Sequence, residues 1–173
     1  MQTNDRSHSA GIGVGGEHQQ YLTFRLGDET FAQPILVTKE ILEYPHLTNV
    51  PLMAPCVRGV LNLRGAVVPV VDLAVRFGHP ASVPTRRTCV VILEIQSGDE
   101  WLDIGVVVDG VNQVIEIPSD QIEPPPNFGS KLRADFIKGM GRIDGGFVVV
   151  LDSDHVLSID EIAALDQHTM QAA

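Results

Sequence analysis

Alternating apolar and polar residues mark much of this chain and predict a series of short β-strands. In "YLTFRLGDETFAQPI" (21–35) this alternation flanks a Gly-Asp-Glu turn, which predicts a β-hairpin. The stretch "TCVVILEIQSGDEWLDIGVVVDG" (88–110) repeats the plan around a Ser-Gly-Asp-Glu turn. The valine-rich runs "VVPVVDL" (67–73) and "FVVVLD" (147–152) hardly alternate. Such runs are typical of strands that are buried on both faces.

Signals for helix are few. "APCVRG" (54–59) predicts a single helical turn that ends at Gly59. Near the end of the chain, Ser158 and Glu161 fit the S-x-x-E capping box. The residues that follow carry a narrow apolar stripe, so we expect a C-terminal helix over 158–168 that packs on the rest of the protein.

The chain has 173 residues, of which 44% are hydrophobic and 20% are charged, so it can bury a core in one domain or in two very small ones. Residues 1–18 are polar and rich in glycine, and they predict a disordered N-terminal tail. Residues 19–168 then form a single module.

Parts of the module repeat along the chain. Four residues recur 80 positions later in the same or related form: Arg58 as Lys138, Gly59 as Gly139, Gly65 as Gly145 and Asp72 as Asp152. Upstream, "KEILE" (39–43) overlies "NQVIE" (112–116). A chance match between valine-rich stretches is the alternative, but the spacing of glycine and aspartate favours a duplicated small barrel. A barrel closes its own sheet edges.

Net charge limits the class of partner. The formal charge is −10, which argues against nucleic acid as the main ligand because no basic surplus can replace counterions. No apolar run is long enough for a membrane span, and the first residues lack the apolar segment of a signal peptide. We therefore expect a cytoplasmic protein without direct membrane insertion, in which Cys56 and Cys89 are buried free thiols.

Residues that could perform chemistry are dispersed. The densest group is "LDSDHVLSIDE" (151–161), where Asp152, Asp154 and His155 offer a candidate metal site. A solvated entry to the C-terminal helix explains the same acids, because the helix dipole favours them there. Neither a nucleophile elbow nor a phosphate-binding loop occurs in the sequence. The sequence predicts a non-enzyme without a cofactor, and a metal-binding enzyme is the alternative.

One loop is unusually apolar. "EYPHLTNVPLMAP" (43–55) contains three prolines, yet it carries several large apolar side chains. Loops lie at the surface, so part of this apolar content is a candidate contact for a protein partner. The alternative is that these side chains fold back and plug the end of a barrel.

Four segments resemble one protein family: "RGVLNLRGAVVPVVDL" (58–73), "IGVVVDGVNQVIEIPSDQIEPPP" (104–126), "FIKGMGRIDGGFVVVLD" (136–152) and "EIAALD" (161–166). Over about residues 20–168 the chain resembles the CheW-like chemotaxis coupling proteins. The resemblance implies a mostly β fold of two small five-stranded SH3-like β-barrels about a shared core, with a short C-terminal helix. It also implies a non-enzymatic adaptor that joins the cytoplasmic tip of methyl-accepting chemoreceptors to the regulatory domain of the CheA histidine kinase.

The resemblance also suggests which residues make the contacts. For the receptor it implies Thr38, Glu40, Gly59, Arg64 and Gly65, of which the last two belong to the "NLRG" motif. For the kinase it implies Glu43, Tyr44, Leu47 and Val50. In the alternative interpretation, Arg64 pairs with an acid of its own barrel, such as Asp72.

The chain departs from the family pattern in two places, at Ala32-Gln33-Pro34 and at Thr38. The chain has "FAQPIL" (31–36) where the family commonly has an aromatic residue, glycine and isoleucine followed by an acid, and Thr38 replaces a usual valine. Pro34 lacks a backbone donor and suits a strand edge or a bulge. Both positions lie near the expected receptor groove. They point to an unusual receptor, or to a paralogous chemosensory system that serves pili or another output.

Overall fold

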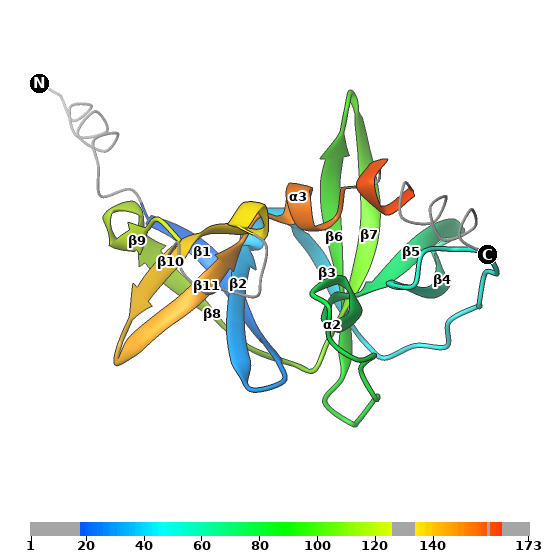
Figure 1. The fold of residues 1–173 in the computed structure, drawn as a ribbon, viewed down its shortest axis with the longest axis horizontal. Helices are drawn as coiled ribbons and strands as arrows, with labels where there is room; N and C mark the ends of the chain where they lie inside the picture. The colour runs from blue at the N-terminus through cyan, green and yellow to red at the C-terminus, as the bar shows by residue number, and fades with distance from the viewer. Residues whose placement is uncertain (1–17, 126–133, 159, 164–173) are drawn as a thin grey trace, which may run out of the picture.

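The computed structural model describes residues 18–125, 134–158 and 160–163. The predicted N-terminal tail, apart from His18, lies outside these residues, and so does the predicted helix beyond residue 163. Figure 1 shows two β-sheets side by side, joined by short helical segments. Within the described ranges, no helix is long and apolar enough to cross a membrane.

One sheet has five strands and is built from a continuous stretch of chain. The strands are β3 (Thr38–Glu43), β4 (Val57–Leu63), β5 (Ala66–Asp72), β6 (Cys89–Ser97) and β7 (Glu100–Val108). Their order across the sheet is β3-β6-β7-β5-β4. The pair β5 and β7 is parallel, whereas the other neighbours are antiparallel.

The other sheet has six strands and combines the beginning of the chain with its end. The strands are β1 (His18–Leu26), β2 (Glu29–Pro34), β8 (Gly110–Pro118), β9 (Ile122–Glu123), β10 (Ile137–Ile143) and β11 (Gly146–Leu151). Their order is β8-β1-β2-β11-β10-β9, so the N-terminal hairpin occupies the middle of the sheet.

The two sheets share one plan. The order β8-β1-β2-β11-β10 matches β3-β6-β7-β5-β4 strand for strand, including the parallel pair. The register shifts at Gly59 in β4 and at Gly139 in β10. An aspartate at the end of β5 and another directly after β11, Asp72 and Asp152, each cap a one-turn helix, α2 (Leu73–Arg76) and α3 (Ser153–Val156). The predicted fold class is confirmed, with the two-residue β9 as an additional sixth strand.

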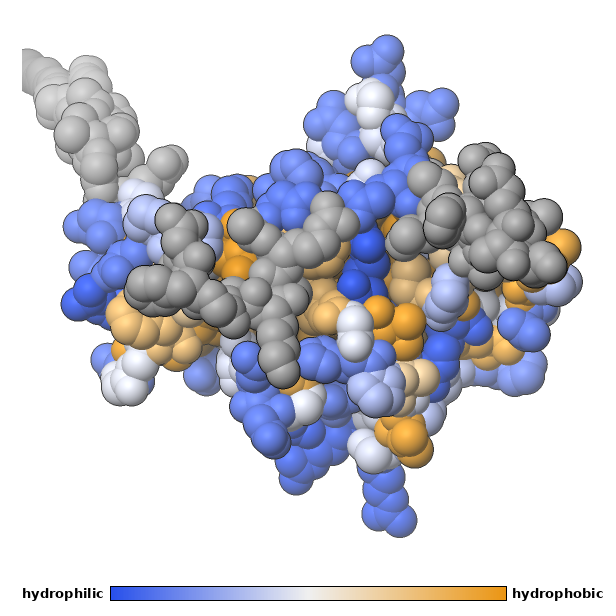
Figure 2. Space-filling model, in the orientation of Figure 1, coloured by the Kyte–Doolittle hydropathy of each residue, from blue (hydrophilic) through white to orange (hydrophobic). Residues whose placement is uncertain are grey.

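Three apolar clusters hold the sheets together. One lies in the five-stranded sheet around Val70 and Ile92, and another lies in the six-stranded sheet around Ile117 and Val150. The third and largest fills the space between the sheets and includes Phe24, among many others. Apolar side chains are also gathered where the sheets meet in Figure 2, whereas the projecting β6–β7 hairpin is polar. The molecule thus has the shared core that the resemblance implied.

The valine-rich strand β5 is buried on both faces over Val70–Asp72, as its pattern predicts, but Val67 near its start is 72% exposed. Val68 and Val70 belong to the core of the five-stranded sheet, whereas Val71 belongs to the core between the sheets. Three 3-10 helices connect strands elsewhere: η1 (Ile35–Val37), η2 (Ser119–Gln121) and η3 (Ala134–Phe136).

The helical turn predicted over 54–59 is wrong. Ala54 starts a tight turn, in which its carbonyl accepts a hydrogen bond from Val57 N at 2.9 Å, and β4 begins at Val57. The strand is favoured because β4 pairs with β5 on one side and with Thr48 on the other. Gly59 therefore lies inside a strand and does not end a helix.

The predicted cap at Ser158 is present. Ser158 Oγ accepts a hydrogen bond from Glu161 N at 3.3 Å, and Ser158 O accepts one from Ile162 N at 3.0 Å. The carboxylate of Glu161 pairs with Arg76 at 2.8 Å, and Ser158 N donates to His155 O at 3.4 Å.

Candidate functional site

Arg64 and Gly65 form the tip of the β4–β5 hairpin. Their φ angles are 52° and 88°, and Leu63 pairs with Ala66, so this is a two-residue turn with both central residues in the left-handed region. Gly65 N donates to Asn62 Oδ1 at 2.8 Å and fixes the turn. Asparagine, aspartate and glycine are the usual first residues of such a turn, so Arg64 is held in an unfavourable conformation.

Arg64 also joins the two outer strands of the five-stranded sheet. Its Nη2 lies 2.8 Å from Glu40 Oε1 on β3, at the opposite end of the strand order from β4. The sheet must curl for these atoms to meet, and the Thr48–Val60 bridge closes it further. The Arg64 side chain is 72% exposed, whereas that of Glu40 is 28% exposed. An intramolecular partner for Arg64 therefore exists, but it is Glu40; Asp72 pairs with Arg58 instead.

Thr38 and Pro34, which depart from the family pattern, are linked through Gln33. The Gln33 side chain is buried, and its Nε2 donates to Thr38 Oγ1 at 3.1 Å. Thr38 Oγ1 in turn donates to Pro34 O at 3.3 Å. A buried amide needs such a partner, so the threonine hydroxyl compensates for the glutamine. Pro34 and Thr38 depart from the family pattern at separate positions in the sequence. In the structure both belong to one hydrogen-bond network beside the exposed Leu36.

Gly59 lies at the other end of β4 from Arg64. Its φ is 153°, and a Cβ built there would lie 2.6 Å from Thr48 O and 3.3 Å from Leu47 Cβ. Gly59 thus makes room for the segment that follows β3. Of the residues predicted to bind the receptor, Glu40, Arg64 and Gly65 lie together, whereas Gly59 contacts the segment predicted for the kinase.

Within that segment, Tyr44 and Leu47 fold back onto the core of the five-stranded sheet. The guanidinium of Arg58 lies over the Tyr44 ring, 5.8 Å from its centroid. Leu52 and Met53 are the exposed apolar side chains, at 71% and 41%. Tyr44 and Leu47 therefore behave as expected of side chains that plug the end of a barrel. Leu52 and Met53 behave as expected of side chains that contact a protein partner. Glu43 is exposed and Val50 is half-buried, and their role in kinase binding stays a prediction.

The sequence did not predict the burial and partners of two charged groups, Asp72 and Arg76. Asp72 is fully buried and accepts hydrogen bonds from Arg58, Ala74 and Ser82. Arg76 is almost buried, donates from Nε to Val156 O at 2.7 Å, and lies over the Phe136 ring. The repeat of Asp72 at position 152 was a signal for the first group. No local pattern marks the second, because its partners are about 80 residues away in sequence.

The candidate metal residues are engaged with one another. Asp152 Oδ1 accepts a hydrogen bond from His155 N at 3.2 Å, and His155 Nδ1 lies 3.0 Å from Asp152 Oδ2. In the part of the chain that the structure describes, no three His, Cys, Asp or Glu side chains are placed to hold a metal ion. The geometry is that of a helix cap with a local ion pair.

The Asp152 carboxylate raises the pKa of His155 above its ordinary value, mainly through their hydrogen bond. We expect Asp152→Asn to lower this pKa, and Asp154→Asn to lower it less because Asp154 is a minor cause. A raised folded-state pKa means that any stability from this pair is present at low pH and is lost as the pH rises through that pKa. An NMR titration of the imidazole measures the shift. An unchanged pKa in Asp152→Asn would contradict the assignment.

The family model described as CheW-like domain matches residues 20–161. The protein named Chemotaxis protein CheW from Klebsiella aerogenes is 34% identical over 160 residues, which cover 92% of each chain. The crystal structure of the scaffolding protein TtCheW from Thermoanaerobacter tengcongensis superposes with a TM-score of 0.73 at 26% identity, over 82% of this chain and 94% of that one. A shorter match, 31% over 99 residues and 56% of this chain, is to Protein PilI from Pseudomonas aeruginosa. By its sequence and its two-sheet architecture, the chain belongs to the CheW-like domain family.

Proposed function

We propose that this chain is a non-enzymatic cytoplasmic adaptor. It joins the tip of methyl-accepting chemoreceptors to the regulatory domain of a CheA-type histidine kinase, and it passes receptor signals to the kinase. Membership of the CheW-like family and the similarity to a scaffolding protein support this function.

Arg64 is the observation that carries the proposal. An arginine held in the left-handed region at the exposed tip of a hairpin costs stability, and such strain is concentrated at functional sites. Asp144 is the counterpart of Arg64 in the β10–β11 hairpin, and it is not among the residues with positive φ. The left-handed backbone strain therefore occurs at the tip of the β4–β5 hairpin, which carries the arginine, and not at the corresponding position of the β10–β11 hairpin.

The ion pair with Glu40 leaves Arg64 able to bind a partner. Among the residues that the structure describes, Arg64 uses only Nη2 for a hydrogen bond, and a guanidinium has five N–H donors. The remaining donors can reach a carboxylate or the carbonyl groups at the end of a receptor helix, while Glu40 holds the side chain in place. We infer that Glu40 orients Arg64 toward the receptor, and that Thr38 and Gln33 shape the wall beside it.

Arg64→Asn separates binding from folding. Asparagine suits the turn, and an exposed ion pair contributes only about 0.5 kcal/mol, so we expect the free energy of unfolding to change by less than about 0.5 kcal/mol. Affinity for a receptor cytoplasmic fragment should fall at least about tenfold, because the charged donors are lost. Calorimetric titration and denaturant unfolding measure the two quantities.

Arg142→Asn is the matched control. Arg142 is 58% exposed, pairs with Glu123 and lies over the Phe147 ring near the other hairpin tip. It has the same charge and a similar setting, so its loss should leave affinity for the receptor fragment unchanged. If both variants bind the receptor as the parent does, Arg64 is not a receptor contact. If Arg64→Asn loses stability but not affinity, its role is structural.

A second candidate is the scaffold of a paralogous chemosensory system that serves pili or another output. The match to the protein named PilI favours it, as do the departures at Pro34 and Thr38. Capture of the cell's CheA-type kinases on immobilised protein distinguishes the two, because each candidate pairs with a different kinase.

A further inference from the structure

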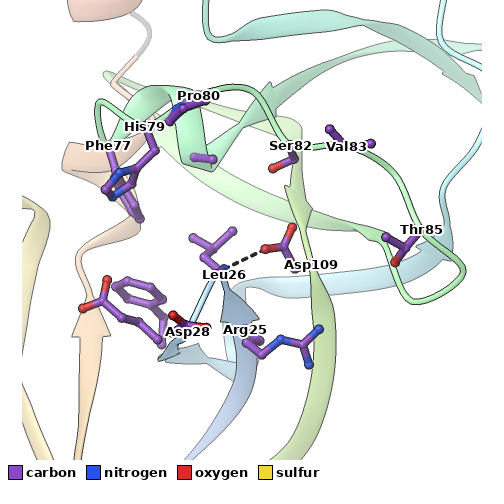
Figure 3. A pocket seen from close by; sticks show the side chains of 14 residues that line it. Arg25, Leu26, Asp28, Phe77, His79, Pro80, Ser82, Val83, Thr85 and Asp109 are labelled. Atoms are coloured by element: carbon purple, nitrogen blue, oxygen red, sulfur yellow. Dashed lines mark hydrogen bonds between the residues drawn. The ribbon is translucent and has the colours of Figure 1, made fainter.

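A cavity of about 610 Å³ opens on the side of the molecule where the two sheets meet at α2. Its walls are the turn of the β1–β2 hairpin, the helix α2 with the loop that follows it, and Asp109 between β7 and β8 (Figure 3). This volume lies within the range of about 300–1,000 Å³ that is usual for ligand sites.

The interior of the cavity is apolar and aromatic. Phe31 and Phe77 line it with ring centroids 5.6 Å apart, and Leu26 lies beside them. Val83, at the rim, is 79% exposed. An apolar side chain of a ligand would gain contact with this part of the wall, whereas His79, Ser82 and Thr85 supply polar groups elsewhere in the lining.

Carboxylates surround the opening. Asp28 and Glu29 are exposed, and neither forms an ion pair with any described residue. Asp109 contributes a third carboxylate, although its Oδ2 already accepts a hydrogen bond from Gly27 N at 2.7 Å. The guanidinium of Arg25 lies against Gly110 and is directed away from Asp28 in Figure 3. The negative charge at the opening is therefore not neutralised by the one arginine that lines it.

The loop wall is held rigidly in place. Ser82 N donates to the buried Asp72 at 3.0 Å, and Ser82 O accepts from Arg58 Nη2 at 2.7 Å. Farther along, Thr85 N donates to Thr88 Oγ1 at 2.8 Å. An ion pair with a buried carboxylate and a partly exposed guanidinium thus holds this surface loop, so the cavity is formed before any ligand arrives.

We propose that this cavity binds a segment of a partner protein in which an arginine or lysine lies beside a large apolar side chain. The apolar side chain packs against the half-buried Phe77 in the cavity, and the cation meets Asp28 and Glu29. A chain of net charge −10 attracts cationic segments and repels a second copy of itself. The site is independent of the receptor contact proposed above, since it adjoins α2 at the opposite end of β5 from Arg64.

The probe is N-acetyl-phenylalanyl-arginine amide, titrated into the ¹⁵N-labelled full chain. We expect saturable shifts of the Gly27 and Gly78 amides with a Kd of roughly 1 mM, a value suited to a dipeptide. The variant with Asp28→Asn and Glu29→Gln should weaken binding at least about fivefold. Its substitutions are exposed, so folding should not be affected.

The chain supplies its own matched control. The β6–β7 hairpin has the same Gly-Asp-Glu turn, so Asp99→Asn with Glu100→Gln removes equal charge elsewhere and should leave the Kd unchanged. The acidic probe N-acetyl-phenylalanyl-glutamate amide should bind at least about fivefold more weakly. Absence of saturable shifts, equal binding of the two probes, or equal effects of the two double variants would overturn the proposal. Arg64→Asn should not alter the titration, which keeps this test separate from that of the receptor contact.

Discussion

Replacing Asp72 by alanine is expected to lower the free energy of unfolding by about 3–4 kcal/mol. The carboxylate is fully buried, pairs with Arg58 at 2.5 Å, and accepts hydrogen bonds from Ala74 and Ser82. Its removal leaves a partly buried guanidinium and several donors without an acceptor. For a chain of this size the melting temperature should fall by about 10 °C. Calorimetry or denaturant unfolding measures the loss.

The internal repeat provides the comparison. Asp152 caps α3 as Asp72 caps α2, but its ionic partner is the exposed His155. Asp152→Ala should therefore cost only about 1 kcal/mol, the usual contribution of a cap. The difference between the variants isolates the buried pair from the cap. Equal losses would mean that the Arg58–Asp72 pair adds nothing beyond capping.

Gly59→Ala is expected to destabilise the protein by about 3–4 kcal/mol. The new Cβ would lie 2.6 Å from a backbone oxygen, that of Thr48, at a φ of 153° that side chains rarely adopt. Strain and overpacking each cost about 1–3 kcal/mol. Relief requires the segment after β3 to move away from β4, so binding of the kinase regulatory domain should weaken as well if that segment is its contact.

Gly65→Ala is the control for strain alone. Its φ is 88°, but a Cβ there meets nothing within 4 Å, so we expect a loss of about 1–2 kcal/mol. Gly139→Ala should cost less than Gly59→Ala, because its φ is not in the left-handed region and the atom 2.6 Å from its Cβ, Ile122 Cγ2, belongs to a side chain that can move. A Gly59 variant that unfolds like the Gly65 variant would show that the segment moves without cost.

The local features of the fold could be predicted from the sequence because they depend on near neighbours. Both hairpins follow from alternation around a Gly-Asp-Glu turn, and the repeated spacing of glycine and aspartate predicted the shared plan of the sheets. The helical turn predicted over 54–59 is wrong because proline and glycine also favour turns beside strands. The pairing of β4 with β5 and with Thr48 decides for the strand.

The site was less predictable, because its residues meet only when the sheet closes. The resemblance named Arg64 and Glu40, but their ion pair joins outer strands, and the alternative interpretation had paired Arg64 with Asp72, an acid nearer in sequence. Composition likewise could not separate Tyr44 and Leu47, which pack inward, from Leu52 and Met53, which are exposed. Similar apolar side chains in one loop differ only in which of them the core can accommodate.

The position of the N-terminal hairpin has a consequence for the order in which the protein can form. β1 and β2 leave the ribosome first, yet their neighbours in the sheet are β8 and β11, and β11 ends only at Leu151. More than a hundred residues are added after Pro34, which takes roughly 6–20 s at about 5–20 residues per second. During that time β3 to β7 can complete their sheet, while the hairpin has no strand to join. This hairpin, synthesised before β8 and β11, is thus among the last elements to find its place, and its two edges stay open to wrong partners until then.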